Sequence, residues 1–219
     1  GENRWIKLVA HLVCYEEDPD VYAYVFMMDI TDQKQKEQSL RQRAETDDLT
    51  GLYNRHTAIP MVRNYLQTTA HPKGALIMFD LDNFKQVNDV FGHVYGDKVI
   101  IENAQKLQNS FREEDIVCRI GGDEFMVFCR NITPEIVQEK LNGIVKNMQT
   151  VFCSKGKEII FSVSAGCAVV PVHGTDFEEL YHKADVALFQ AKLNGKSTCM
   201  VYEDSMQSVR YEMLKDPHE

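Results

Sequence analysis

Apolar residues near the start of the chain follow the period of a β-strand. Every second residue from Ile6 to Cys14 is apolar, and Val21–Ile30 is again rich in apolar and aromatic residues after the turn-like sequence EEDPD. This pattern predicts two strands, Trp5–Tyr15 and Val21–Ile30. Because two strands alone bury too little surface to fold, we expect residues 1–30 to be the C-terminal fragment of a larger domain.

Residues 31–46 change this pattern, because Gln, Lys, Glu and Arg dominate them. Thr31 is in position to cap a helix, and steps of three and four residues align Ile30, Leu40 and Ala44 on one side. The segment is therefore predicted to be a helical linker. A solvated connecting helix and a coiled-coil stalk explain this sparse apolar seam equally well.

The middle of the chain predicts a buried strand between helices. Asn54 is expected to cap a helix, which Pro60 should kink or delay. Ala75–Phe79 is a continuous apolar run that ends at Asp80, and such a run is typical of a central strand buried on both faces. Asp82 is in position to cap a short helix. An amphipathic helix follows, with inward positions at Val99, Ile100, Ala104 and Leu107.

Three later segments continue this alternation of helices and strands. Pro134 opens a helix, Ile159–Val170 is predicted to be a long strand, and Asp176 with Glu179 begins a helix that ends near Gly195. The inward positions are Ile136, Leu141, Ile144, Val145 and Met148 in the first helix, and Phe177, Leu180, Ala184, Leu188 and Ala191 in the second.

Ile116–Cys129 is predicted to be a β-hairpin. Apolar and other residues alternate from Ile116, Gly121-Gly122 permits a tight turn, and a second strand follows. Asp123 and Glu124 then lie at the hairpin tip. Two acidic residues at such a tip more often make a soluble turn than a functional site, so the pattern alone assigns them no chemistry.

Composition narrows the class of protein. The chain has 219 residues, 44% of them hydrophobic, with a net charge of −9 and no basic run; this argues against nucleic acid or an anionic membrane as partner. No apolar run approaches the ~18 residues of a membrane span, although a membrane anchor elsewhere in a parent protein stays possible. The six cysteines include no C-x-x-C pair, and we expect reduced core thiols in a cytoplasmic protein.

Four separated motifs carry a family resemblance. They are Gly121-Gly122-Asp123-Glu124-Phe125, the D-x-L-T-G-L-x-N-R sequence of residues 47–55, the D-x-D-x-F-K-x-x-N-D…G-H-x-x-G-D pattern of residues 80–97, and Ala184–Lys196. From Asp47 to Tyr202 the chain resembles the GGDEF family of diguanylate cyclases. It departs from the family at Phe189, where Tyr is usual, and at Lys196, where Arg is more usual.

The resemblance implies a fold and a division of the chain. The fold would be α/β, with a central, mainly antiparallel sheet flanked by helices as in nucleotidyl cyclases and polymerase palms. Residues 1–30 would be the end of a PAS-like sensor domain, because Asp29-Ile30-Thr31-Asp32 resembles the exit of such a domain. Residues 31–46 would be a signalling linker, 47–202 the GGDEF domain, and 203–219 a tail or a connector to a downstream domain.

The resemblance also implies site residues. Asp80, the Leu81 carbonyl and Asp123 would hold Mg²⁺ or Mn²⁺, two ions per active site, and Glu124 would serve the second ion or a proton transfer. The remaining implied residues bind substrate: Asn88 and Asp97 would read guanine, and Lys85, Lys192 and Lys196 would hold phosphates. The Asp97 carboxylate suits the N–H groups of guanine and opposes N1 of adenine.

A further site is implied immediately before the hairpin. Arg112 and Asp115 have the spacing of the family's R-x-x-D inhibitory site, where a guanidinium can bind the product. Without the family, this segment would be a charged surface loop. The implied function is condensation of two GTP into cyclic di-GMP by a homodimer, with product inhibition. A non-catalytic module that binds GTP or cyclic di-GMP is the alternative; an ATP-dependent cyclase is disfavoured by Asp97.

Overall fold

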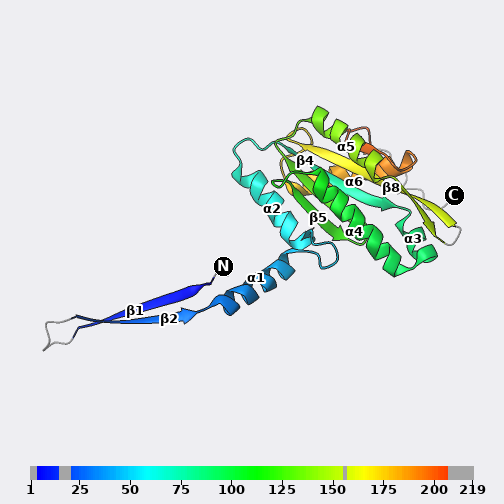
Figure 1. Ribbon diagram of the computed structural model, residues 1–219. Helices are drawn as coiled ribbons and strands as arrows, with labels where there is room; N and C mark the ends of the chain where they lie inside the picture. Colours follow the sequence, from blue (N-terminus) through cyan, green and yellow to red (C-terminus); the bar gives the residue numbers. More distant parts are fainter. Residues whose placement is uncertain (1–3, 15–20, 155–156, 207–219) are drawn as a thin grey trace, which may run out of the picture. The chain divides into compact units, whose positions relative to one another are not determined.

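The computed structural model describes residues 4–14, 21–154 and 157–206, and the chain divides into two compact units, Gly1–Glu45 and Thr46–Glu219. In the first unit, β1 (Ile6–Cys14) pairs antiparallel with β2 (Val21–Asp29), and α1 (Thr31–Glu45) follows (Figure 1). Large apolar side chains of both strands, among them Leu12 and Met27, are exposed. The described part of this unit therefore has no core of its own.

The second unit is built on a mainly antiparallel sheet, as predicted. Its described strands are β3 (Tyr53–Asn54), β4 (Gly74–Asp82), β5 (Ile116–Gly121), β6 (Glu124–Arg130), β7 (Thr150–Ser154), β8 (Lys157–Val170) and β9 (Cys199–Val201). They are ordered β3-β5-β6-β4-β8-β7, with β9 beside β8. The β3–β5 and β8–β9 pairs are parallel, and the other pairs are antiparallel.

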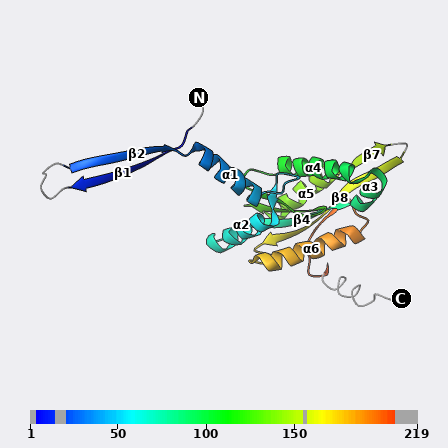
Figure 2. The same ribbon diagram turned by 90° about the horizontal axis from the view of Figure 1, so that it is seen from below.

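Helices cover both faces of this sheet, which makes the fold α/β. One face carries α2 (Arg55–Thr68) and α6 (Phe177–Leu193), and the other carries α4 (His93–Ser110) and α5 (Pro134–Met148). The short helix α3 (Phe84–Phe91) links β4 to α4. Figure 2 shows α4 and α5 on one side of β4 and β8, with α6 on the other.

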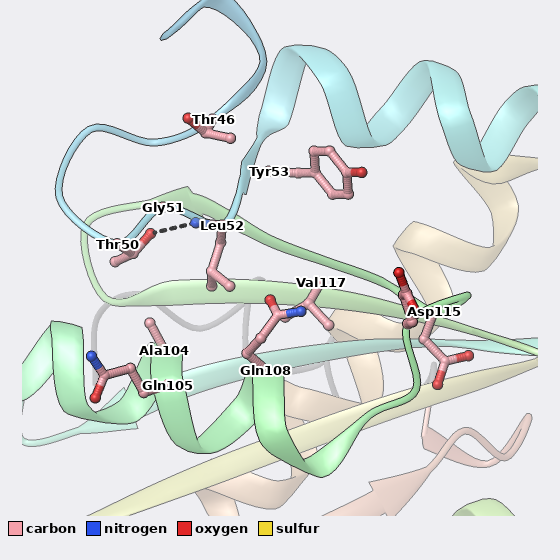
Figure 3. A pocket seen from close by; sticks show the side chains of 11 residues that line it. Thr46, Thr50, Gly51, Leu52, Tyr53, Ala104, Gln105, Gln108, Asp115 and Val117 are labelled. Carbon is pink, nitrogen blue, oxygen red and sulfur yellow. Dashed lines mark hydrogen bonds between the residues drawn. The ribbon is translucent and has the colours of Figure 1, made fainter. Parts of the chain in front are cut away.

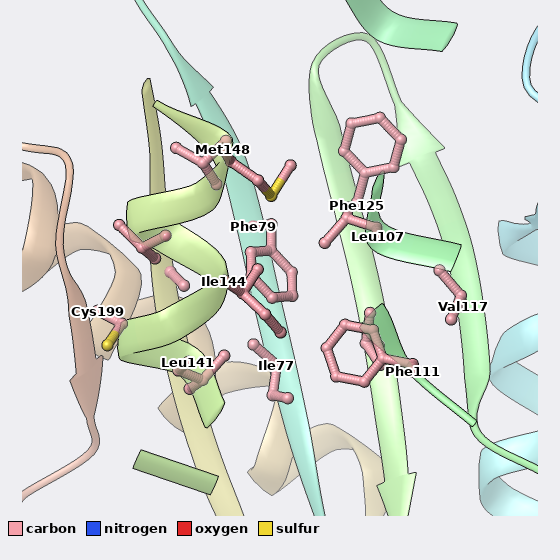
Figure 4. Close-up of a cluster of buried hydrophobic side chains, with 14 of the residues drawn as sticks. Ile77, Phe79, Leu107, Phe111, Val117, Phe125, Leu141, Ile144, Met148 and Cys199 are labelled. Carbon is pink, nitrogen blue, oxygen red and sulfur yellow. The ribbon is translucent and has the colours of Figure 1, made fainter. Parts of the chain in front are cut away.

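The alternation of side chains along β4 divides the core in two. Phe79 and its odd-numbered neighbours pack with α4 and α5, whereas Leu76 and Met78 pack with α2 and α6. Figure 4 shows the first cluster, with Phe79 beside Ile144 of α5. The strand is buried on both faces, as predicted, but it continues to Asp82. By the same alternation, Asp80 and Asp82 belong to the face that α6 covers.

Gly166 on β8 lets α6 approach this face closely. A Cβ atom at this position would lie 2.0 Å from the Leu188 nitrogen and 2.2 Å from the Ala184 oxygen. Any larger residue would push α6 away from the sheet. The glycine therefore fixes the height at which α6 carries its side chains over β4 and β8.

Several local predictions need correction. Asp82 does not cap α3: the residue before that helix is Asn83, with φ 60° and no side-chain cap bond. Of the two effects predicted for Pro60, a delayed start is not observed, because α2 begins at Arg55 and includes Pro60. Asn54 caps the helix as predicted, and its side chain accepts from the Thr57 N–H at 3.0 Å.

Two more differences concern helix faces and ends. Ile136 is 56% exposed and its neighbour Val137 is buried instead, since Pro134 starts α5 with Val137 toward the sheet. At α1, the Thr31 N–H donates to Asp29 Oδ1 at 2.9 Å, so Asp29 makes the capping contact.

Some predictions fall outside the described residues or side chains. Most of the predicted tail or connector, residues 203–219, lies outside the described residues, and the side chains of Leu40, Cys14 and Cys153 are not described. The other four cysteines are free and buried, in agreement with the prediction of reduced core thiols.

Candidate active site

The predicted hairpin is confirmed, with two acidic residues at its tip. Gly121 ends β5 and pairs with Glu124, the first residue of β6, so Gly122 and Asp123 make the turn. Gly122 has φ 54°, in the left-handed region that a glycine adopts without strain. The register shifts between Arg119 and Gly121. Such a bulge re-aims the end of a hairpin.

Arg119 fastens this tip to the start of the domain. Its Nε and Nη2 atoms donate to the Gly122 carbonyl at 3.0 and 2.8 Å. Its Nη1 atom donates to both carboxylate oxygens of Asp47, at 3.0 and 3.2 Å. One guanidinium thus joins the turn before β3 to the turn that carries Asp123. Sequence analysis missed this residue, although a charged side chain among the apolar residues of β5 was a signal.

The end of β4 lies beside the hairpin tip, as the metal-site prediction required. Asp80 is the register partner of Glu124, and the Leu81 N–H donates to the Asp123 carbonyl at 3.2 Å. Burial raises the pKa of Asp80 above its ordinary value, and the negative charges of Asp123 and Glu124 add to this shift while Lys192 opposes it. The carboxylates are close enough to repel one another, so this is a place where a cation would be stabilised.

Two of the three predicted phosphate-binding lysines reach this end of the sheet, one from the last turn of α6 and one from the loop after it. Lys192 Nζ lies 2.7 Å from Asp80 Oδ2, and Lys196 Nζ donates to Asn83 Oδ1 at 2.8 Å. Lys85 is exposed on the first turn of α3, directly after β4. Positive charge from two separate elements therefore flanks the acidic residues.

The predicted guanine-reading residues lie on neighbouring helices, Asn88 on α3 and Asp97 on α4. Asn88 Oδ1 is buried and has no hydrogen-bond partner among the described residues, whereas Asp97 is exposed. A buried acceptor without a partner is costly, and a ligand with N–H donors would satisfy it. Gly96 makes the site possible, because a Cβ there would lie 1.9 Å from Asn88 Oδ1.

The oxygen atoms near Asp80 suit a hard divalent cation. Asp80 and Asp123 offer carboxylates, and Leu81 offers a carbonyl, which are ligand types that Mg²⁺ and Mn²⁺ accept. Across the described residues, no group of three or more His, Cys, Asp or Glu side chains could hold an ion by itself. Mg²⁺ commonly takes one or two carboxylates and completes its shell with water and substrate phosphates, so the donor set fits.

Arg112 and Asp115 lie at the opposite end of β5 from the glycines. Asp115 is buried, and its carboxylate accepts from the backbone N–H groups of Arg112 and Arg130, each at 3.0 Å. The Arg112 guanidinium is exposed and lies 3.6 Å from Glu114. Together with Lys140, Arg112 and Asp115 line a cavity of about 80 Å³. Asp115 thus shapes the loop, and Arg112 is available to a ligand.

A larger pocket of about 430 Å³ lies between α4 and the turn before β3. Figure 3 shows Gln105 and Gln108 of α4 on one side, with Thr50 and Leu52 of the turn on the other. It contains none of the predicted catalytic or substrate-binding residues. Asp115 is the one predicted site residue that this pocket shares.

Comparison with known proteins decides the family. The family model for the diguanylate cyclase GGDEF domain matches residues 44–198. The chain belongs to the GGDEF family. The match covers the GGDEF hairpin, the end of β4, Lys192 of α6 and Lys196 of the loop after it, so the residues gathered above are those of a GGDEF domain.

Individual relatives of this GGDEF chain carry different activity names. It is 30% identical over 186 residues to the cyclic di-GMP phosphodiesterase PdeR of Escherichia coli K12, covering 85% of the chain and 28% of PdeR. It is 32% identical over 182 residues to the bifunctional diguanylate cyclase/cyclic di-GMP phosphodiesterase MucR of Pseudomonas aeruginosa, covering 82% of the chain and 27% of MucR. The chain thus spans about a quarter of these curated relatives.

The fold of the GGDEF domain agrees with a solved structure. A truncated PA1120 (TpbB or YfiN) of Pseudomonas aeruginosa, comprising only the GGDEF domain, superposes with a TM-score of 0.70 at 29% identity, over 76% of this chain and 99% of that one. Among the described residues, no helix combines the length and hydrophobicity that crossing a bilayer would require.

Proposed function

We propose that the chain is a diguanylate cyclase that condenses two GTP molecules into cyclic di-GMP and releases two pyrophosphates. The observation that carries the proposal is the meeting of Asp80, at the end of β4, with Asp123 and Glu124 at the hairpin tip. Lys192 lies 2.7 Å from Asp80. Acidic residues that hold a cation next to basic residues that hold phosphates are the parts that phosphoryl transfer needs.

The chain's own residues would bind and orient the substrate. Lys192 and Lys196 would neutralise the triphosphate, with Lys85 reaching in from the first turn of α3. Asn88 Oδ1, a buried acceptor, would take an N–H of guanine, and Asp97 would accept from the base edge. Adenine presents an acceptor at N1, so Asp97 would select against ATP.

The cofactor in this proposal is Mg²⁺ or Mn²⁺, two ions per active site. Asp80, the Leu81 carbonyl and Asp123 would hold the ions, and Glu124 would serve the second ion or take a proton. When bound, the ions would lower the pKa of the 3′-hydroxyl and offset developing phosphoryl charge. A bound cation would also stabilise the ionised form of Asp80, whose pKa is raised by burial and, to a smaller extent, by the charges of Asp123 and Glu124.

The chemistry requires two copies of the domain. Each 3′-hydroxyl loses its proton and forms a bond to the α-phosphorus of the other GTP, while the bond from that phosphorus to pyrophosphate breaks. Because each copy supplies one GTP, two sites must face each other, and we propose a homodimer as the active form. Activity per chain should then rise with protein concentration until the dimer saturates.

We further propose product inhibition through Arg112 and the loop that Asp115 holds.

We also propose that the chain is divided into a PAS-like fragment (1–30), a signalling linker (31–46), the GGDEF domain (47–202) and a tail or connector (203–219). A cytoplasmic location fits these roles. The name of PdeR, which gives only phosphodiesterase activity, supports a second candidate, a domain that binds GTP or cyclic di-GMP and regulates a neighbour without catalysis.

One assay separates the two candidates. The purified chain is incubated with GTP and Mg²⁺, the products are separated by chromatography, and GTP binding is measured in parallel with a non-hydrolysable analogue. Cyclic di-GMP from the wild type but not from Asp123→Asn supports the cyclase. Binding without product supports the regulatory module, and neither binding nor product contradicts both.

A further inference from the structure

We infer that Asp82 is a positioning residue, which holds the loop Gly195–Ser197 so that Lys196 reaches the substrate phosphates. The inference rests on the proposed function, because it concerns the same GTP site. Asp82 was predicted to cap α3, but its side chain does something else. It points to the face of the sheet that α6 covers, and it joins three segments that are distant in sequence.

The first two contacts come from β8. Ser162 and Ser164 donate their hydroxyls to the two carboxylate oxygens of Asp82, at 2.7 and 2.8 Å. All three side chains are buried, and Asp82 is 2% exposed. Burying a carboxylate is costly unless hydrogen bonds stabilise it. These contacts between neighbouring strands orient the carboxylate.

The third contact comes from the loop after α6. The Ser197 N–H donates to Asp82 Oδ2 at 3.0 Å. The Asp82 side chain therefore holds the backbone of the loop and not one of the loop's side chains. Hydrogen bonds to an ionised acceptor are among the strong ones in proteins. Asp82 therefore fixes where the chain goes after α6 ends.

That loop needs an external anchor because its backbone is strained. Lys196 has φ 64° and Ser197 has φ 51°, and the left-handed region is unfavourable for residues that carry a side chain. Gly195, at φ 100°, ends the helix, and the Lys196 N–H returns to the Ala191 carbonyl at 3.2 Å, which is a Schellman-type end. This motif stabilises the left-handed conformation of Lys196, and the contact with Asp82 stabilises that of Ser197.

These two contacts determine the position of Lys196, which lies between them. Lys196 Nζ donates to Asn83 Oδ1 at 2.8 Å, so its side chain lies over the residue that follows Asp82. Asn83 itself has φ 60°. The two strained turns, one after β4 and one after α6, thus face each other and are joined both by Asp82 and by the Lys196–Asn83 contact.

The test is a double-mutant cycle on binding of a non-hydrolysable GTP analogue with Mg²⁺ to the full chain. Asp82→Asn places an amide donor opposite existing donors, so we expect about tenfold weaker binding. In a Lys196→Ala background there is no lysine for the loop to position, so the same change should weaken binding less than about twofold. Asp176→Asn is the matched control, since its carboxylate caps the far end of α6, and it should leave affinity unchanged.

The outcomes separate this inference from the proposed function. Equal losses of affinity in both backgrounds would show general structural damage and overturn the positioning role. Unchanged affinity of Asp82→Asn would also overturn it. If Asp82→Asn does not fold, Ser164→Ala removes one contact to the carboxylate and should weaken binding about threefold, again only when Lys196 is present; no weakening overturns the inference. A wild type that binds no analogue contradicts the proposed function, and this inference with it.

Discussion

At the scale of single residues, Asp80 combines opposite demands of chemistry and stability. Catalysis would need its charge, whereas burial disfavours that charge and raises its pKa in the folded state above the ordinary value of 3.8. A raised pKa means that the folded state favours the protonated form. The stabilisation present at low pH is therefore lost as pH rises through the folded-state pKa.

Asp80→Asn should therefore lose activity and gain stability. An amide cannot ionise, and it can still accept from Lys192, so we expect no cyclic di-GMP and a higher Tm than the wild type at pH 7.5. The difference in Tm should narrow toward pH 5, where more of the wild-type carboxyl is protonated when folded. Thermal unfolding at both pH values checks this. A lower Tm for the variant at pH 7.5 would contradict the conclusion that burial of this charge destabilises the folded state.

Gly96 offers a second test at this scale. Alanine there would place Cβ 1.9 Å from Asn88 Oδ1, so the buried acceptor must move, and we expect GTP affinity to fall about tenfold or more. Gly143→Ala is the control, because a Cβ on that helical glycine meets nothing within 4 Å. The control should stabilise the protein by about 0.5–1 kcal/mol and leave binding unchanged. Calorimetric titration with the GTP analogue compares the two, and equal affinities would remove Asn88 from the base site.

At the scale of elements, the hairpin depends on a contact outside itself. Arg119 is 13% exposed and joins the Gly122 carbonyl to Asp47. Partial burial disfavours the charge of Asp47, but hydrogen bonds from Thr50 and Arg119 keep the pKa of this carboxyl below its ordinary value. Such a carboxylate contributes stability above its unfolded pKa, and this contribution is lost as pH falls.

We expect Arg119→Gln to lower the free energy of unfolding by about 1–3 kcal/mol at pH 7, because a partly buried carboxylate and a carbonyl lose their donor. The loss should shrink in acid. Arg63→Gln is the control: Arg63 pairs with Glu178, but they are 48% and 65% exposed, so the change should cost less than about 0.5 kcal/mol. Urea unfolding measures both, and similar losses would show that the Arg119 bridge has no special role.

Sequence patterns predicted the elements whose period is set by the core. The hairpin, the buried strand β4 and the inward face of α6 follow the alternation of apolar residues, which local sequence contains in full. Ile136 was misplaced because a shift of one residue moves a side chain by about 100° around a helix, and Pro134 alone did not determine the phase.

The predictions that failed at the site depend on distant partners. Asp82 has the position of a helix cap, but Ser162 and Ser164, which are 80 and 82 residues away, donate to its carboxylate. Arg119 is equally uninformative until Asp47 is seen to lie beside it, at a sequence separation of 72 residues. Local patterns describe only neighbours within a turn or a strand, so contacts of this kind appear only once the sheet order is known.

At the scale of the whole molecule, the candidate inhibitory and catalytic sites lie at opposite ends of β5. Arg112 holds Asp115 through its backbone N–H, at 3.0 Å, so replacing its side chain should leave the loop intact. A ligand bound there touches none of the atoms proposed to bind GTP. Inhibition through this site would therefore be non-competitive.

Arg112→Ala should weaken cyclic di-GMP binding by roughly 30-fold or more, if a charge-assisted bidentate pair is lost. Product yield at long times should rise, while the initial rate stays nearly unchanged. Glu114→Gln is the control, because it removes the partner of Arg112 and should keep or strengthen binding. Calorimetry with cyclic di-GMP decides: no binding to the wild type, or equal binding to wild type and Arg112→Ala, would place no inhibitory site here.

The buried thiols can be used to measure how often the strands of the sheet separate. Cys118, Cys129 and Cys167 lie in β5, β6 and β8; burial raises the pKa of Cys118 to about 12 and the pKa of the other two above their ordinary range. Since only a thiolate attacks a maleimide, labelling at neutral pH must wait until the strands separate. A GTP analogue that binds the folded domain should therefore slow labelling of all three thiols together. Mass spectrometry during labelling measures this, and unequal slowing would show that the strands open independently.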